Sequence, residues 1–487
     1  MPPRARDARA RRGGVTRGHV VRRNEGPRRA GTPARLRSVT VAAAVCATAL
    51  SAGPAVPGAH AADRPRPYET ADDAQRVHGS PSSADAPALG TGPATDRIGP
   101  GEEHFYALDL DARSDVHLSA TALPAPGTRI DYRDGIEISL RTTDGDSCGS
   151  EKVTGTGQTA FPLTAYVARL TGADGNSSCR AAGPYLVRVV REDGDDPSRW
   201  PLELSVLREP ALKGSIPAPH PGTENESDAD SPRPAPPSGT PRPVAGGSGF
   251  NDARAVGGGV WKDRLRPGET RWYRVPVDWG QRLHTAVELP NAARREDGAG
   301  RFVARGFRMN VYNPARGPLY SESFTSYDGD GGKTDHYGNP VRYENRFASA
   351  NSATRLAGWY YVAVTAGPDL AGPFPQGVPV TLRIAVRGKP KPGPRYDGDA
   401  RAAGIGVSDE DRETAAKRLT RAEADDAAAE AALLRTVGWS GVGTGTALLA
   451  VLAAWTLLAR RGGAAAVQPV AGPPGGTPGS GGFPPSP

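Results

Sequence analysis

The chain has 487 residues, of which 62 are Gly and 48 are Pro, and only 37% are hydrophobic. This composition indicates several modest domains joined by open segments rather than one large core. The formal net charge is +7, but residues 1–61 contain twelve arginines and two acids, which leaves 48 basic residues against 51 acidic ones in the rest. Because the basic charge belongs to this N-terminal stretch, the composition excludes a basic nucleic-acid-binding surface in the rest of the chain.

The first 61 residues have the order of a signal peptide. An Arg-rich stretch precedes the apolar run Val39–Leu50, and Ala59-His60-Ala61 then supplies the small residues of a cleavage site. The apolar run is too short and too rich in Ala to span a bilayer stably. We therefore predict cleavage after Ala61, with a signal anchor or a misassigned start codon as the alternatives. Residues 62–90 are predicted to be a flexible N-terminal segment.

Two later segments of the chain repeat each other. Asp96 to Tyr106 reads DRIGPGEEHFY, and 167 residues later Asp263 to Tyr273 reads DRLRPGETRWY. Three further blocks recur in the same order, 135–140 with 306–311, 182–187 with 357–362, and 201–204 with 379–382. The offset only grows along the chain, as loop insertions between fixed elements would make it grow. The pattern predicts an internal duplication.

The repeated blocks alternate with a period of two residues. Tyr106, Leu108 and Leu110, for example, share one face of their strand. Such alternation is typical of antiparallel sheets with one buried and one wet face. The predicted fold class is therefore all-β, with two tandem antiparallel β-sandwich (jelly-roll-like) domains at residues 91–210 and 248–388. Residues 211–247 are predicted to be a Pro-rich linker.

The C-terminal region is predicted to be a stalk, one membrane-spanning helix and a tail. The stalk covers residues 389–436 and contains a helix at 408–436, which Ser408 can cap. Residues 437–459 carry no charge and are followed by Arg460-Arg461, as expected for a transmembrane helix with its C-terminal end in the cytoplasm. Residues 460–487 should be a disordered cytoplasmic tail. The predicted location is the plasma membrane, as a single-pass type I protein with an extracellular N-terminal ectodomain.

Gly441 and Gly445 form a GxxxG pair, which favours close approach of two helices and hence dimerisation. Small residues are also common in membrane helices for no such reason, so this signal is weak. The cysteines give a clearer prediction. Cys46 lies in the predicted leader, and Cys148 and Cys179 are an even pair in an exported domain, so we expect a disulfide between them.

The repeats resemble a known family of modules. A Pro-Gly-Glu turn, an aromatic-Tyr strand, and late Gly-aromatic-Tyr and Pro-Leu/Val strands are similar to bacterial pre-peptidase C-terminal domains, jelly-roll-like modules of secreted proteins. Blocks of the second repeat, from 249–253 through 261–264, 278–281, 343–346 and 357–361 to the final helix, resemble the membrane-proximal part of actinobacterial surface proteins, some of which carry a von Willebrand A domain. The DxSxS metal motif of that domain is absent from this chain. The resemblance implies an accessory or adhesive role at the cell surface and identifies no reaction.

Catalytic motifs are missing from the sequence. No GxSxG elbow, HExxH or P-loop occurs, so we predict no catalytic residue, no cofactor and no enzyme activity. His117 and His284 recur at matching positions of the two repeats. Their parity places both opposite the buried face, which predicts solvated strand histidines. The alternative function is an exported, membrane-anchored hydrolase acting on glycan or peptide, with an unrecognised site in domain 2.

Two further features are candidates for ligand binding. Asp328, Asp330 and Asp335 lie among glycines and are weak calcium candidates, although the spacing fails the EF-hand pattern and a soluble hairpin tip is the favoured interpretation. Trp272 and Trp359 share the face opposite the inward tyrosines and could stack on sugar rings, unless a second layer covers them. The sequence thus predicts a non-enzymatic cell-surface protein whose two modules contact cell-wall glycan or another surface protein.

Overall fold

The computed structural model describes residues 65–157, 159–172, 177–217, 235–293, 302–321, 323–348 and 351–462, without the side chains of 177, 347, 435–444, 461 and 462. All of them belong to one compact unit, Ala61–Pro487. The predicted signal peptide at 1–61, residues 218–234 of the predicted linker and residues 463–487 of the predicted tail lie outside the described residues.

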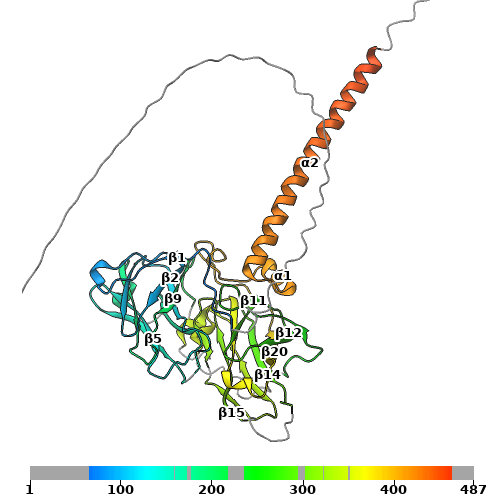
Figure 1. The fold of residues 1–487 in the computed structure, drawn as a ribbon. Coiled ribbons are helices and arrows are strands. Elements are labelled where there is room, and N and C mark those ends of the chain that lie inside the picture. Colours follow the sequence, from blue (N-terminus) through cyan, green and yellow to red (C-terminus); the bar gives the residue numbers. More distant parts are fainter. Residues whose placement is uncertain are drawn as a thin grey trace, which may run out of the picture. The chain divides into compact units, whose positions relative to one another are not determined.

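The first sandwich consists of two sheets with the orders β1-β2-β9-β4-β7 and β3-β8-β5-β6 (Figure 1). Its strands are β1 (Gln75–Arg76), β2 (Gly92–Ile98), β3 (Glu103–Leu110), β4 (Asp115–Ala122), β5 (Gly135–Thr142), β6 (Ser147–Thr154), β7 (Leu163–Arg169), β8 (Gly183–Arg191) and β9 (Trp200–Glu209), with short 3-10 helices η1 (Ser83–Asp85) and η2 (Ser177–Arg180). All strand pairs are antiparallel except β1 with β2. The alternating apolar residues of both sheets form one core.

The second sandwich repeats this architecture, with sheet orders β10-β12-β20-β14-β18 and β11-β13-β19-β15-β16, and β17 paired with β15. Its strands are β10 (Arg242–Pro243), β11 (Arg254–Ala255), β12 (Gly259–Leu265), β13 (Thr270–Val277), β14 (Arg282–Leu289), β15 (Val303–Tyr312), β16 (Pro318–Ser321), β17 (Thr325–Tyr327), β18 (Gly332–Tyr337), β19 (Gly358–Ala366) and β20 (Val378–Arg387). The 3-10 helices are η3 (Tyr343–Phe347), η4 (Ser352–Thr354) and η5 (Pro368–Ala371). A separate core fills it.

The two sandwiches correspond strand by strand, as expected for a duplication. β2, β3 and β4 are each 167 residues before β12, β13 and β14, and the equivalent strands hold equivalent places in their sheets. The correspondence also begins earlier than the sequence blocks indicated. Gln75 pairs in parallel with Ala94, and 167 residues later Arg242 pairs in parallel with Trp261. Each sandwich therefore starts upstream of the predicted boundaries at 91 and 248.

The recurring Asp-Arg and Tyr residues of the repeat form a corner of each sandwich. Tyr106 donates to Asp96 at 2.8 Å, and Tyr273 donates to Asp263 at 2.7 Å. Each carboxylate also accepts the backbone N–H of a glycine in the preceding segment, Gly79 or Gly246, at 2.8 Å. The carboxylate thus joins three chain segments in each sandwich, which is a physical reason for the same residues to appear twice.

Two segments predicted to be open are held by the sandwiches instead. Where a flexible segment is predicted at 62–90, the structure has β1, η1 and the partly buried Tyr68, whose hydroxyl donates to Glu203 at 3.3 Å. At the start of the predicted linker, the Lys213 N–H donates to the Arg395 carbonyl at 2.7 Å, and at its end β10 adds to a sheet. The low apolar content of these segments predicts that they are open. This prediction is wrong because a short strand can join a sheet through backbone hydrogen bonds alone.

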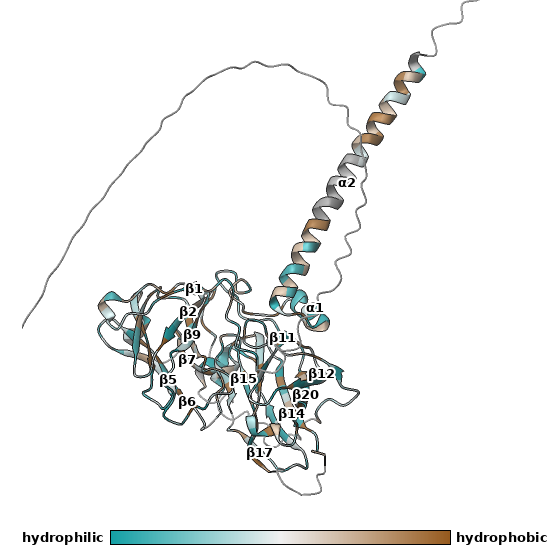
Figure 2. Ribbon diagram, in the orientation of Figure 1, coloured by the Kyte–Doolittle hydropathy of each residue, from teal (hydrophilic) through white to brown (hydrophobic). Residues whose placement is uncertain are grey.

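The predicted stalk helix at 408–436 is divided in two. Helix α1 (Asp409–Lys417) starts at the Ser408 cap, where Ser408 and Asp411 form a capping box, and packs on β11 and β13. It ends at Arg418, which adopts a left-handed backbone with φ of 62°. Helix α2 (Arg421–Gly462) then continues through the predicted span, and its C-terminal half carries exposed apolar side chains (Figure 2).

No helix in the described part of the chain is long and apolar enough to cross a membrane. Residues 437–444 of the predicted span lie outside the residues whose side chains the structure describes, and these include Gly441. Gly445 has no neighbouring atom within 4 Å of where a Cβ would be.

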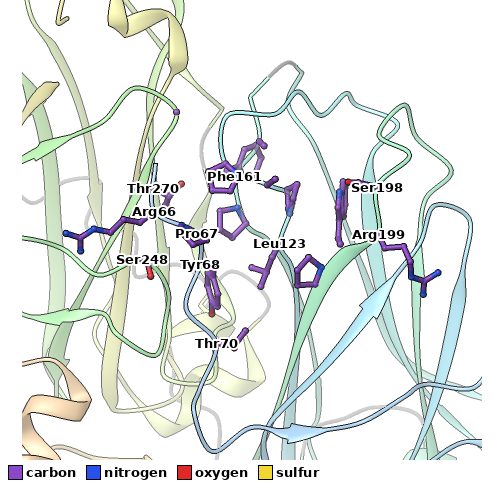
Figure 3. A pocket seen from close by; sticks show the side chains of 18 of the residues that line it. Arg66, Pro67, Tyr68, Thr70, Leu123, Phe161, Ser198, Arg199, Ser248 and Thr270 are labelled. Atoms are coloured by element: carbon purple, nitrogen blue, oxygen red, sulfur yellow. The ribbon is translucent and has the colours of Figure 1, made fainter. Parts of the chain in front are cut away.

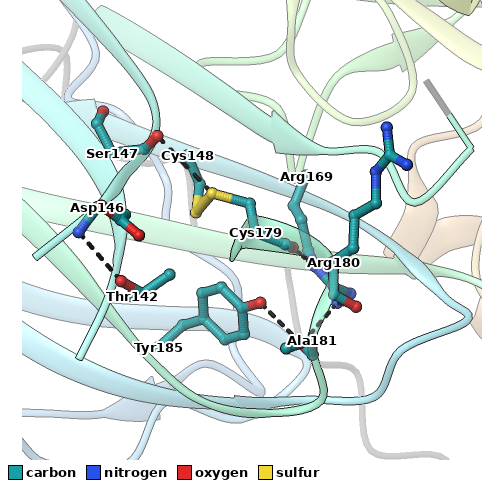
Figure 4. Close-up of a disulfide and its surroundings, with 9 residues drawn as sticks. All are labelled: Thr142, Asp146, Ser147, Cys148, Arg169, Cys179, Arg180, Ala181 and Tyr185. Atoms are coloured by element: carbon teal, nitrogen blue, oxygen red, sulfur yellow. Dashed lines mark hydrogen bonds between the residues drawn. A yellow bond between two sulfur atoms is a disulfide. The ribbon is translucent and has the colours of Figure 1, made fainter. Parts of the chain in front are cut away.

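The predicted disulfide is confirmed. Cys148 on β6 and Cys179 in η2 are bonded, with their Cα atoms 5.6 Å apart (Figure 4). Arg169 fixes the η2 side of this bond, since its Nε donates to the Cys179 carbonyl at 2.7 Å and its Nη2 donates to the carbonyls of both Arg180 and Ala181 at 3.1 Å. The bond therefore ties an edge strand to the loop that leads into β8.

Candidate binding site

The outer face of the β2-β9-β4-β7 sheet is covered by residues of the second sandwich. His117 on β4 is only 1% exposed, so the prediction of a solvated histidine is wrong. The parity argument placed the side chain on the outer face correctly. It failed because Arg346 and Arg355 of the second sandwich lie over that face and bury it.

A closed cluster of charges forms the centre of this contact. Arg346 pairs with Asp115 and, at 2.8 Å, with Glu209. His117 lies 3.1 Å from the second oxygen of Glu209, and its other ring nitrogen is 2.7 Å from the Tyr166 hydroxyl. Burial alone would raise the pKa of Glu209, but the Arg346 charge and the His117 hydrogen bond lower it to about 2. Burial lowers the pKa of His117, so the imidazole is neutral and donates to an ionised Glu209.

A second buried ion pair lies elsewhere in the same contact. Arg316 pairs with Glu203, and Asn251 donates to the other Glu203 oxygen at 2.8 Å. Tyr68 closes this group. The Arg346 group is closed to solvent, which makes it structural and leaves no room for a substrate at the His117–Glu209 pair. Arg316 and Asn251 of the second group also lie on the wall of a cavity.

The two candidate tryptophans have different environments. Trp272 is 1% exposed and lies between Phe250, at 4.3 Å between ring centroids, and Tyr312, at 5.7 Å. A ligand in solution therefore has no access to its rings. Trp359 is partly exposed and lies on the wall of a cavity of about 960 Å³.

The Trp359 cavity, as we call it, lies over the outer face of β13 and β19. Its wall includes Arg274, Trp359 and Tyr361 from these strands, residues 401–404, and Asp411 from α1. The Trp359 indole N–H donates to Asp411 at 2.9 Å, which fixes the ring against α1. The Arg274 guanidinium carbon is 4.3 Å from the centre of the Trp359 ring. The site therefore combines aromatic surface with charged groups.

A second cavity of about 570 Å³ is lined mainly by apolar residues (Figure 3). Leu123, Phe161 and a group of prolines line it, and Tyr68 reaches it from the N-terminal segment. In Figure 3 the Arg66 and Arg199 side chains point outward on opposite sides. Arg199 pairs with Glu102. The wall thus offers few free polar groups for recognition.

The remaining candidates do not form a site. His284 is buried beside Tyr337, with ring centroids 5.0 Å apart, so its predicted solvation is also wrong. Asp328 caps a turn by accepting the Asp330 N–H at 2.9 Å, whereas Asp335 is on β18, 3.8 Å from Lys333. Within the described residues, no three His, Cys, Asp or Glu side chains are grouped to hold a metal ion.

Sequence reasoning missed Arg274 and Tyr361 of the Trp359 cavity. Both alternate with core residues and therefore point outward, and Arg274 lies directly opposite Tyr361 in the strand register. Parity could have placed them beside Trp359. The cover that turns this sheet face into a cavity comes from α1, from residues 401–404 and from β2 and β9 of the first sandwich, and it has no local sequence signal.

Comparison with known proteins gives only remote likenesses. No family model and no curated protein matches the chain. Among solved structures, the pre-peptidase C-terminal domain of a Bacillus anthracis collagenase is similar over 29% of this chain and 99% of its own, at 14% identity and a TM-score of 0.15. The tandem CBM22 domain of a Paenibacillus barcinonensis protein covers 61% of this chain and 86% of its own, at 11% identity and a TM-score of 0.16. Tandem CBM51 modules of a Streptococcus pneumoniae glycoside hydrolase cover 61% and 83%, at 10% identity and a TM-score of 0.18. These TM-scores are too low to carry an argument about function.

Proposed function

We propose that this chain is a non-enzymatic cell-surface protein that binds a cell-wall glycan in the Trp359 cavity. The supporting observation is the pair of partly exposed aromatic side chains, Trp359 and Tyr361, in a concave site with charged neighbours. Aromatic faces pack against the apolar faces of sugar rings, and polar groups around them select the hydroxyls. The resemblance of the second repeat to actinobacterial surface proteins, which implies a role at the cell surface, also supports this proposal.

The environments of two His–carboxylate pairs support a binding role over a catalytic one. The His–carboxylate pair at His117 and Glu209 is closed to solvent. The His104–Asp96 pair, at 2.9 Å, belongs to the corner where Tyr106 also binds. Arg271 occupies the position equivalent to His104 in the second sandwich. A structural corner tolerates this exchange, whereas a catalytic histidine could not be replaced by arginine.

The glycan proposal is tested with the full chain in detergent and with insoluble bacterial cell-wall polysaccharide in a co-sedimentation assay. We expect the protein to sediment with the polysaccharide, and Tyr361→Ala to lower the bound fraction severalfold because a stacking surface is lost. Tyr132→Ala is the matched control, because Tyr132 is an exposed tyrosine outside the cavity. Binding that Tyr361→Ala and Tyr132→Ala reduce equally would reject the cavity as the site.

We further propose that residues 437–459, whose first eight side chains lie outside the described part of the chain, anchor the protein in the plasma membrane, with the sandwiches outside the cell. Exposed apolar side chains at 448, 449, 451, 452, 455, 457 and 458, followed by Arg460-Arg461, support this arrangement. The disulfide supports an oxidising location. Protease added to intact cells should digest the sandwiches and leave a membrane-bound C-terminal fragment. Full protection of the sandwiches would contradict the proposed orientation.

A further inference from the structure

Arg274 lacks the partner that a buried cation needs. It is 8% exposed, on β13, and its Nε has no hydrogen-bond acceptor. The described residues include eight buried arginines, Arg169, Arg191, Arg271, Arg274, Arg308, Arg316, Arg346 and Arg355. Each of the other seven donates to a carbonyl, carboxylate, amide or hydroxyl oxygen. Arg274 alone among these eight makes no hydrogen bond or ion pair within the described part of the chain.

The nearby carboxylates are committed elsewhere. Asp411 accepts from the Trp359 indole and from Ser408 in the cap of α1. Asp425 lies 4.0 Å from Arg421. Both acids act on Arg274 only through their charge, and burial still lowers the pKa of its guanidinium. A charge held in this way is costly unless something pairs with it.

The comparison between the two sandwiches shows that the fold does not require this arginine. The residue 167 positions earlier, on β3, is Ala107, and it lies opposite Leu186 where Arg274 lies opposite Tyr361. The corner residues recur in both sandwiches, but Arg274 and the aromatic residues beside it occur only in the second. Arg274 and these aromatic residues lie on the cavity wall and not in the core, which explains why they occur in one sandwich only.

We infer that the Trp359 cavity binds an anionic group, a carboxylate or a phosphate of an acidic wall polymer, through Arg274. The Arg274 fork matches the two oxygens of such a group, and stacking on Trp359 holds its plane in place. Tyr361, directly opposite, offers the adjoining ring to the sugar. This inference rests on the proposed glycan-binding function and adds the charge of the ligand.

Calorimetric titration of the full chain in detergent with three probes tests the inference. The probes are trigalacturonate, an oligomer of glycerol phosphate, and neutral maltotriose. We expect at least one acidic probe to bind roughly tenfold or more tighter than maltotriose, because pairing relieves a buried charge. Arg274→Met should remove this preference. Arg401→Met, an exposed arginine of the same cavity, should largely retain it. The probe that binds tighter identifies carboxylate or phosphate as the recognised group.

The outcomes separate this inference from the proposed function. Equal binding of all three probes, lowered by Tyr361→Ala and unchanged by Arg274→Met, overturns the anion site and leaves glycan binding intact. Binding of no probe overturns the anion site, and the co-sedimentation assay then decides on glycan binding separately. Thermal unfolding provides a check without ligand, because replacing an unpaired buried charge should not lower Tm. A fall of several degrees for Arg274→Met would show a structural role and overturn the inference.

Discussion

Tyr106 and Tyr273 each donate one hydrogen bond to a carboxylate, that of the buried Asp96 or that of the partly buried Asp263. Replacement by Phe removes the donor while the ring stays, so we expect each variant to lose about 2 kcal/mol of unfolding free energy. Tyr185→Phe is a useful comparison because its hydroxyl donates to a neutral carbonyl of Ala181 at 2.7 Å, and its loss should be about 1 kcal/mol. Chemical denaturation measures all three. Equal losses would indicate that the charge of the acceptor is unimportant.

The buried His117 makes stability sensitive to mild acid. Burial depresses its folded pKa below the ordinary value of 6.5, so the unfolded chain binds a proton that the folded chain does not. Stability should therefore fall as pH decreases below about 6.5. The lowered pKa of Glu209, which burial opposes and Arg346 and His117 cause, gives a further loss as pH falls from about 4.5 towards 2. In denaturation curves, His117→Gln should flatten the first loss, and an unchanged slope would contradict this assignment.

At the level of the elements, the disulfide restricts the loop between β6 and the start of β8. Cys148 and Cys179 are 31 residues apart, and closing a loop of that length stabilises by roughly 3 kcal/mol in the chain-entropy model. We expect the double variant Cys148→Ser/Cys179→Ser to unfold at lower denaturant concentration by about that amount. Wild-type protein treated with a reductant is the control and should show a similar loss. Full stability after verified reduction would exclude a stabilising role.

The packing of elements against one another explains why the two histidine predictions are wrong. Strict alternation along β4 and β14 placed His117 and His284 on the outer faces of their sheets, and both are there. Alternation reports which residues share a face, and it cannot report whether another element covers that face. The second sandwich covers His117, and Tyr337 on the neighbouring strand packs against His284.

At the level of the whole molecule, the buried ionic contact should make the two sandwiches unfold together. Arg346→Met leaves Asp115 and Glu209 buried without a counter-charge, which should cost about 3 kcal/mol or more. We expect calorimetry to show one transition for the wild-type sandwiches and two for this variant.

The combined variant Asp115→Asn/Glu209→Gln/Arg346→Met removes all three charges of this group. It should recover much of the loss, because no unpaired charge remains. Two transitions already in the wild type would show that the contact does not couple the sandwiches.

The strand alternation, the duplication, the disulfide partners and the Ser408 cap could all be predicted from the order of residues alone. Each of these depends on neighbouring residues or on a match between two segments, and such signals lie within the chain order. Cys148 and Cys179 were the one pair left after Cys46 was assigned to the leader. The early start of each sandwich was missed because Gln75-Arg76 and Arg242-Pro243 are held by backbone hydrogen bonds, which leave little trace in side-chain pattern.

Which outer sheet faces are exposed to solvent, and hence where the candidate site lies, depends on how the elements pack in three dimensions. Trp272 and Trp359 have the same parity, yet Phe250 and Tyr312 bury one while the other borders a cavity. The difference arises because residues far apart in the chain meet over that sheet. The isolation of Arg274 is a property of the same assembly, since a buried charge is unpaired only with respect to the groups that the fold brings around it.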